Sequence, residues 1–240
     1  MDILSINVID VCLVLLVLLA GVVGFKRGVF KELVLTIGFY ILLFISFIIK
    51  TPIGEWMGLY LPFFDFGGPL KGYVTLNIIL YHIIAFILVF AVLGIIFSVI
   101  VTVTKILEKI LDATILLGLV SKILGFFVGL LEGYVIIFLL CIFLQFPIFN
   151  QTVVADSKLK DKVLYNTPVL SNYTSSLVNT VTDTVDLVNK SKDMDKDEFN
   201  LQVVKIMLDN KMTTKKYITN LKWQNKLDVP GLQELLDNYS

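Results

Sequence analysis

The residue of this sequence most able to do chemistry in an apolar setting is Glu132. It lies in the stretch SKILGFFVGLLEG, next to Gly133. If Lys122 marks a boundary between membrane and water, ten helical residues place the Glu132 carboxyl about 15 Å deep. An isolated charge at that depth is costly, so the carboxyl must be protonated, paired or hydrated. It is either a glutamic acid hydrogen-bonded between helices or a proton- or cation-responsive group lining a polar cavity.

Few other groups could act together with Glu132. His82 lies beside Tyr81 near the start of another apolar stretch, where it is either an interfacial hydrogen-bonding residue or part of a proton relay. Lys26 or Arg27 could pair with Glu132 only if the turn that carries them enters a helix bundle. These groups form no catalytic dyad, and the sequence has no metal, P-loop or dinucleotide motif. We therefore expect no enzyme, no cofactor and no metal site.

The composition indicates what kind of protein positions these residues. The 240 residues are 57% hydrophobic and 17% charged, with a mean hydropathy of +0.86, which is more apolar than a soluble domain of this size. The formal net charge is zero, so no nucleic-acid partner is expected. Backbone groups in lipid need internal hydrogen bonds, and no series of alternating strands is visible. We predict an all-α membrane protein.

Four apolar segments are long enough to cross a bilayer. They run over about residues 8–24, 33–49, 76–103 and 123–146. We expect the second segment to end at Pro52, with Lys50 at the interface, and the third to tilt or to extend past the membrane. After residue 149, basic and acidic residues occur in equal number. The prediction is a transmembrane four-helix domain over 1–149, followed by a small soluble helical domain over 150–240.

The stretch GFKRGVFKEL predicts the turn of a helical hairpin between the first two segments. Gly24 and Gly28 would relax the backbone there, while Lys26, Arg27 and Lys31 would lie among lipid headgroups. By the positive-inside tendency this turn faces the cytoplasm, as does the basic connection between the third and fourth segments. Both termini are then expected outside.

Two connections carry patterns of their own. Residues 103–122 combine apolar residues at helical spacing with charges, which predicts an amphipathic helix on the cytoplasmic membrane surface. Residues 50–74 are rich in aromatic side chains. They form either an interfacial belt or a short re-entrant or surface-lying segment that shapes a binding site.

The fourth segment carries the clearest packing pattern of the chain. Ser121, Gly125, Gly129 and Gly133 recur every four residues, which is a double GxxxG motif extended by a small serine. Such a face lets another backbone approach closely. Its partner is either another span of the same chain or a second copy.

These motifs together resemble a known family. Asp10, the GFKRGVFKEL turn and the stretch SKILGFFVGLLEGYVI are similar to the colicin V production family, CvpA, over about residues 5–146. In that family the second motif usually opens with an Asp-Arg pair and has a basic residue before its last glycine, whereas this chain has Ser121, Lys122 and Glu132 there. The resemblance implies a bacterial inner-membrane protein linked to colicin production or export and to envelope stress, with residues 150–240 as an addition.

Two classes of function follow. The first is a non-enzymatic membrane scaffold linked to toxin production or export and to envelope homeostasis. It would assemble in the bilayer with itself or with an envelope protein through the glycine face, and would use its exported domain for docking. The alternative is a small transporter or channel subunit in which Glu132, His82 and the turn cations line a polar path. The scaffold is favoured because one deep carboxyl provides few polar groups for such a path.

Overall fold

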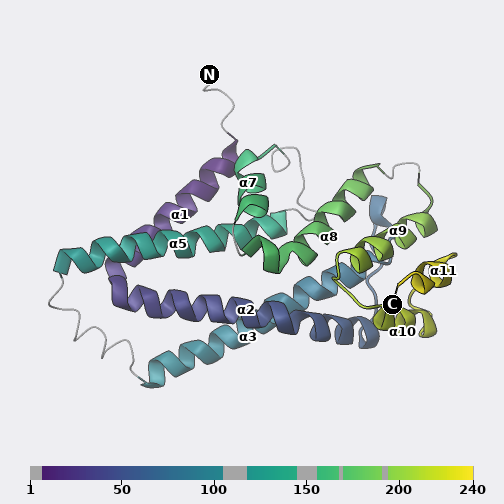
Figure 1. The fold of residues 1–240 in the computed structure, drawn as a ribbon, viewed down its shortest axis with the longest axis horizontal. Helices are drawn as coiled ribbons and strands as arrows, with labels where there is room; N and C mark the ends of the chain where they lie inside the picture. The colour runs from purple at the N-terminus through teal and green to yellow at the C-terminus, as the bar shows by residue number, and fades with distance from the viewer. Residues whose placement is uncertain (1–6, 105–117, 145–155, 168–169, 191–193, 240) are drawn as a thin grey trace. The chain divides into compact units, whose positions relative to one another are not determined.

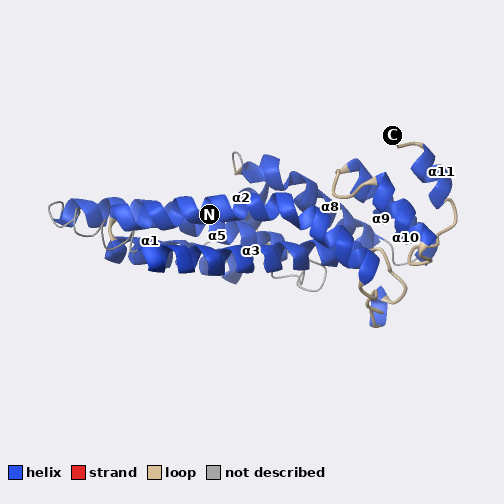
Figure 2. Ribbon diagram, turned by 90° about the horizontal axis from the view of Figure 1, so that it is seen from below, coloured by secondary structure: helices blue, strands red, loops and turns tan. Residues whose placement is uncertain are grey.

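The computed structural model describes residues 7–104, 118–144, 156–167, 170–190 and 194–239. These residues form α-helices joined by loops, with one short 3-10 helix and no strand (Figures 1 and 2). The prediction of an all-α chain is therefore confirmed. Most of the predicted amphipathic helix at 103–122 falls outside the described residues.

Four of the described helices are long and apolar enough to cross a membrane. They are α1 (Val8–Arg27), α2 (Val29–Tyr60), α3 (Leu76–Thr104) and α5 (Gly118–Leu144). The 3-10 helix η1 (Gly68–Leu70) lies between α2 and α3. The helices that follow are α7 (Lys158–Asn166), α8 (Leu170–Lys190), α9 (Lys196–Asp209), α10 (Lys215–Trp223) and α11 (Leu232–Asp237).

Helix α2 continues through Pro52, so the prediction that this proline ends the helix is wrong. Proline removes one hydrogen bond from a helix interior, but a helix tolerates it where neighbouring groups hold the chain. Further along, Lys226 donates hydrogen bonds to the carbonyl oxygens of Gly58, Leu59 and Leu61 at the actual end of α2. Lys50, which we expected at the interface, is only 5% exposed. With 32 residues, α2 is about 48 Å long, which exceeds a hydrocarbon core of about 30 Å.

The contacts divide the chain into two compact units. Unit 1 comprises residues 1–45 and 90–171, and unit 2 comprises residues 46–89 and 172–240. Each unit thus combines segments that are far apart in the sequence, whereas the expected domains were consecutive. The predicted boundary near residue 150 stays a prediction.

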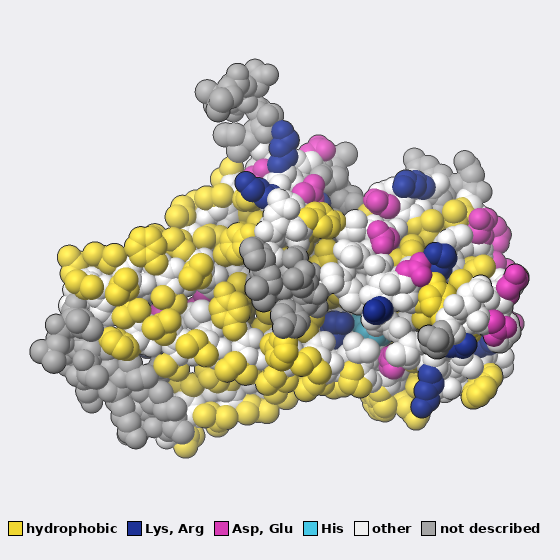
Figure 3. Space-filling model, viewed as in Figure 1, with side chains coloured by type: hydrophobic (Ala, Val, Ile, Leu, Met, Phe, Trp, Pro, Cys, Tyr) yellow, Lys and Arg dark blue, Asp and Glu magenta, His cyan; other side chains and the backbone are white. Residues whose placement is uncertain are grey.

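Unit 1 contains most of the apolar surface that the spans expose. Figure 3 shows mainly hydrophobic side chains over the region of α1 and α5. Large exposed side chains of this unit include Leu15, Leu19, Ile95, Val103, Leu119 and Leu131. Soluble monomers rarely expose apolar patches of this extent, so these faces are suited to contact with lipid.

Unit 2 has a core of large buried side chains. Phe199, Val203, Met207, Ile218 and Leu221 are fully buried. The rings of Tyr73 and Phe199 stack with their centroids 3.8 Å apart. This core joins the C-terminal helices to the segment that precedes α3.

Candidate functional site

The α5 stripe of small residues packs against α1 of the same chain, and all four of its members are buried. A Cβ atom added at Gly129 would lie 2.5 Å from the carbonyl oxygen of Ala20, and one added at Gly133 would lie 2.7 Å from the Cβ of Ala20. Gly24, expected to relax the turn, instead lies inside α1 and packs against the backbone of Gly125 and Gly129. Of the two partners left open by the sequence, α1 therefore occupies this face.

The turn between α1 and α2 consists of one residue, Gly28. Its φ of 78° lies in the left-handed region that favours glycine. The Gly28 N–H donates to the Gly24 carbonyl at 2.9 Å, which closes the end of α1. The Ser121 hydroxyl oxygen accepts a hydrogen bond from the Val29 N–H at 3.2 Å. It satisfies one of the free N–H groups at the start of α2, so α5 holds the turn in place.

Two glutamates from different helices meet beside this crossing. Glu32, in the first turn of α2, is only 1% exposed. The Arg27 guanidinium donates to its carboxylate at 3.3 Å. The Thr36 hydroxyl, one turn further along α2, donates to Glu132 Oε2 at 3.1 Å. Glu132 therefore has a hydrogen-bond partner on α2, and Glu32 is paired with Arg27.

The polar face of α2 that meets Glu132 was missed in the sequence. Glu32, Thr36 and Tyr40 recur every four residues and so share one side of the helix. Tyr40 interacts electrostatically with Glu132. Because Glu32 lies close to Lys26, Arg27 and Lys31 in the sequence, the pattern indicates only a charged turn there. Its spacing to Thr36 and Tyr40 was the available signal.

The structure does not bring the other predicted polar residues to this pair. Lys26 is exposed and Lys31 is half-buried, as suits side chains near headgroups. His82 belongs to unit 2, where it is fully buried. Its Nδ1 bonds to the Ile78 carbonyl at 2.8 Å, while no polar partner of its Nε2 is found.

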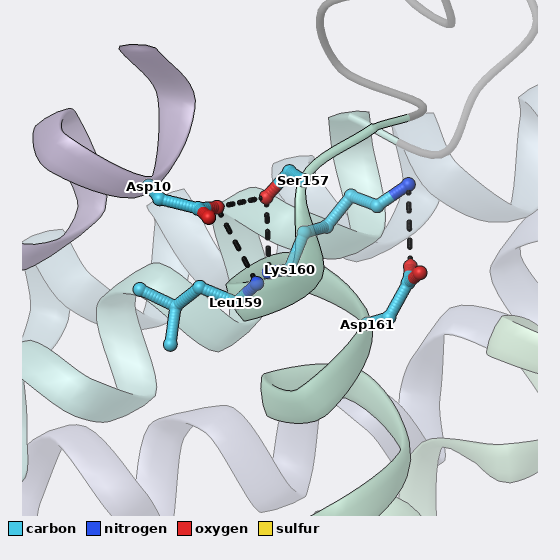
Figure 4. Close-up of polar contacts among 5 residues, drawn as sticks. All are labelled: Asp10, Ser157, Leu159, Lys160 and Asp161. Carbon is cyan, nitrogen blue, oxygen red and sulfur yellow. Dashed lines mark hydrogen bonds and ion pairs between the residues drawn. The ribbon is translucent and has the colours of Figure 1, made fainter. Parts of the chain in front are cut away.

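A second polar cluster anchors the start of α1 to α7 (Figure 4). The Asp10 carboxylate accepts hydrogen bonds from the Ser157 hydroxyl and, at 3.3 Å, from the Leu159 N–H. The Ser157 oxygen in turn accepts from the Lys160 N–H at 3.1 Å and caps α7. Lys160 pairs with Asp161 at 3.4 Å. Asp10 thus has a structural role that the sequence alone did not reveal.

The two clusters are built from carboxyl, guanidinium, ammonium and hydroxyl groups. The described residues contain no group of three or more metal-ligating side chains. The cluster around Glu32 and Glu132 combines carboxyl, guanidinium and hydroxyl groups. These groups can bind charge and exchange protons.

Span-length helices with lipid-facing apolar surfaces and a glycine-lined crossing define an integral membrane protein of the helical-bundle class. Within that class, the chain matches the family described as colicin V production protein over residues 9–168 and belongs to this family. The match extends past residue 146 and includes α7. No curated protein and no solved structure matches the chain.

Proposed function

We propose that the protein is a non-enzymatic assembly component of the bacterial inner membrane, linked to toxin production or export and to envelope homeostasis. It recruits an acidic segment of an envelope protein through unit 2. Membership of the colicin V production family supports the first part. The observation that carries the second part is an exposed tryptophan in a basic groove on α10.

The glycine face of α5 is not available for this recruitment. It is occupied by α1, and the carboxyl groups beside it are paired within unit 1. A partner contact through that face would require α1 to leave. We therefore place the surface for assembly on unit 2.

The groove on α10 has the composition of a protein-binding site. It has a volume of about 410 Å³ and is lined by Lys215, Lys216, Thr219, Asn220 and Trp223. Trp223 is 77% exposed, and residues 211–227 contain lysines but no acidic residue. Tryptophan is enriched among residues that dominate binding energy, while the lysines favour an acidic partner. We call this surface the α10 groove.

Photo-crosslinking in intact cells tests this proposal. A photoreactive residue replacing Trp223 should give a product heavier than the chain, whereas one replacing Lys205, an exposed residue of α9, should not. The charge reversal Lys216→Glu should abolish the product, because it repels an acidic segment. Mass spectrometry should locate the crosslink in an acidic stretch of an envelope protein. Absence of a product, or one that persists with Lys216→Glu, would count against the proposal.

A second candidate function is a small transporter or channel subunit, favoured by the Glu32–Glu132 pair inside unit 1. In that case Glu132→Gln should abolish pH-dependent flux into proteoliposomes while Trp223→Ala leaves it unchanged. Equal flux in the wild type and Glu132→Gln would exclude this role for the carboxyl.

A further inference from the structure

We propose that the aromatic side chains of Trp56 and Tyr60 lie in a headgroup layer of the bilayer and bind the end of α2 to the membrane surface. They belong to a surface that comprises Ile48, Pro52, Trp56 and Tyr60, which we call the α2 ridge. The ridge shares no residue with the α10 groove. The proposal is therefore independent of the assembly function proposed above.

The α2 ridge is an exposed apolar surface of unit 2. Its four members are the exposed residues of α2 within this unit. They recur every four residues and so form one continuous row along the helix. Trp56 is 56% and Tyr60 is 69% exposed, and the centroids of their rings are 5.5 Å apart. A row of exposed apolar side chains without a charge marks a contact surface.

The charged residues of this part of the chain lie away from the ridge. Lys50 is buried. Glu55 is half-buried, and its carboxylate accepts hydrogen bonds from the hydroxyl groups of Thr213 and Thr214 at 3.3 Å. The next exposed charged residue along the chain is Asp65, in the loop after α2. Exposed charge thus resumes only after the helix has ended, which places the boundary between lipid and water near that end.

The length of α2 agrees with this depth. Its 32 residues span about 48 Å, and a bilayer with both headgroup layers is about 40–45 Å thick. With the cations of the α1–α2 turn in one headgroup layer, the other end of α2 reaches the opposite layer. Tryptophan and tyrosine are enriched there, because their rings are apolar while the indole N–H and the phenol hydroxyl find polar partners.

The same end of α2 is bound to the C-terminal helices of unit 2. Lys226 donates hydrogen bonds to the carbonyl oxygens of Gly58 and Leu59. A Cβ atom added at Gly58 would collide with the Tyr217 hydroxyl group, so α10 packs closely against this glycine. An aromatic anchor at Trp56 and Tyr60 would therefore hold α10 close to the membrane surface.

Quenching of tryptophan fluorescence by brominated lipids tests the depth of the ridge. The chain has two tryptophans, so Trp223→Phe isolates Trp56, and Trp56→Phe isolates Trp223. With the full chain in liposomes, bromine close to the headgroups should quench Trp56 about twofold more than bromine at the bilayer centre. Trp223, which lines the basic α10 groove, is the matched control and should be quenched little by either lipid.

Equal quenching of Trp56 by the two lipids, or quenching of Trp56 no greater than that of Trp223, would overturn the proposal. A measurement on the wild type keeps the test decisive if a variant fails to fold. Iodide, a quencher dissolved in water, should quench the part of the fluorescence that brominated lipids leave unchanged. If iodide and the shallow brominated lipid quench the same part, the ridge faces water and the proposal is wrong.

Discussion

The two units of this protein use different means to hold helices together. In unit 1, α1 and α5 approach through Gly24, Gly125 and Gly129, so that backbone meets backbone. In unit 2, buried large side chains such as Phe199 and Met207 fill the core. Lipid provides no hydrophobic force between helices, so close backbone contact and polar pairs must hold them. In unit 2, the buried apolar side chains contribute to the packing of the helices.

The polar contacts of the two units also differ in the groups that they join. In unit 1, the carboxyl group of Glu32 binds Arg27 and that of Glu132 binds Thr36, so that each bond joins two helices. In unit 2, Lys226 binds the carbonyl oxygens of Gly58, Leu59 and Leu61 at 2.6–2.9 Å. Lys226 thereby donates hydrogen bonds to carbonyl oxygens at the end of α2, where the helix itself provides no donor. The polar contacts of unit 1 thus join side chains of different helices, whereas the Lys226 contact of unit 2 satisfies backbone carbonyl groups at the end of a helix.

The largest effect is expected where the backbones of unit 1 meet. A side chain at Gly125 would collide with the Gly24 carbonyl, so Gly125→Leu should destabilise unit 1 by about 3 kcal/mol. Denaturant unfolding in mixed micelles measures the change. Gly94→Leu is the matched control, because nothing lies within 4 Å of a Cβ added there. Equal stability of the two variants would contradict the close crossing.

A smaller effect is expected at the end of α2 in unit 2. Lys226→Met removes the charged donor from three carbonyl groups, which should cost about 2 kcal/mol. Hydrogen exchange should show faster opening of residues 56–61. The control is Lys222→Met, because Lys222 bonds only to the Gln233 side chain among its described contacts. If Lys226→Met leaves exchange unchanged, Lys226 does not hold this helix end.

The smallest effect is expected from the Asp209–Tyr239 contact, which lies near water. Tyr239 donates to Asp209 at 2.5 Å. Burial, followed by this bond, raises the pKa of Tyr239 to about 12. The hydrogen bond from Lys205, followed by that from Tyr239, lowers the pKa of Asp209. Asp209 therefore stabilises unit 2 above its ordinary pKa of 3.8 and ceases to do so as the pH falls further.

Tyr239 contributes in the opposite direction. Its stabilising effect is complete below its ordinary pKa of 10.0 and is lost as the pH rises toward about 12. Melting temperatures across this range should therefore fall more steeply at both ends for the wild type than for Asp209→Asn. Parallel curves for the two proteins would show that the contact does not contribute.

The sequence predicted those features that a bilayer or a helical period imposes. Bilayer thickness sets the length of a span, and runs of apolar residues of that length are visible in the sequence. The helices α1 and α3 begin at Val8 and Leu76, where these runs begin. The prediction that α2 ends at Pro52 was wrong, because the one backbone hydrogen bond that proline removes does not by itself end a long helix. Lys226, far along the chain, binds the actual end of α2.

The candidate site was predictable only in part for a similar reason. The four-residue spacing on α5 predicted a packing face. The apolar surroundings of Glu132 indicated that its carboxyl group needs a partner, because an isolated charge there is costly. Glu32 was overlooked because the sequence places it among turn cations. Only the folded chain shows that Gly28 turns α2 back so that Glu32 faces α5. Asp10 and Ser157 were unpredictable because no periodic pattern links them.

The most direct test of the account asks whether α1 and α5 of one chain pair with each other. A Cβ atom at Gly21 would lie 2.8 Å from Leu130 Cδ2, so cysteines at the two positions would face each other across the contact between α1 and α5. With Cys12 and Cys141 replaced by serine, oxidation of Gly21→Cys/Leu130→Cys in membranes should give a monomer with an internal disulfide. A disulfide-linked dimer without an internal bond would show that the glycine face joins two copies.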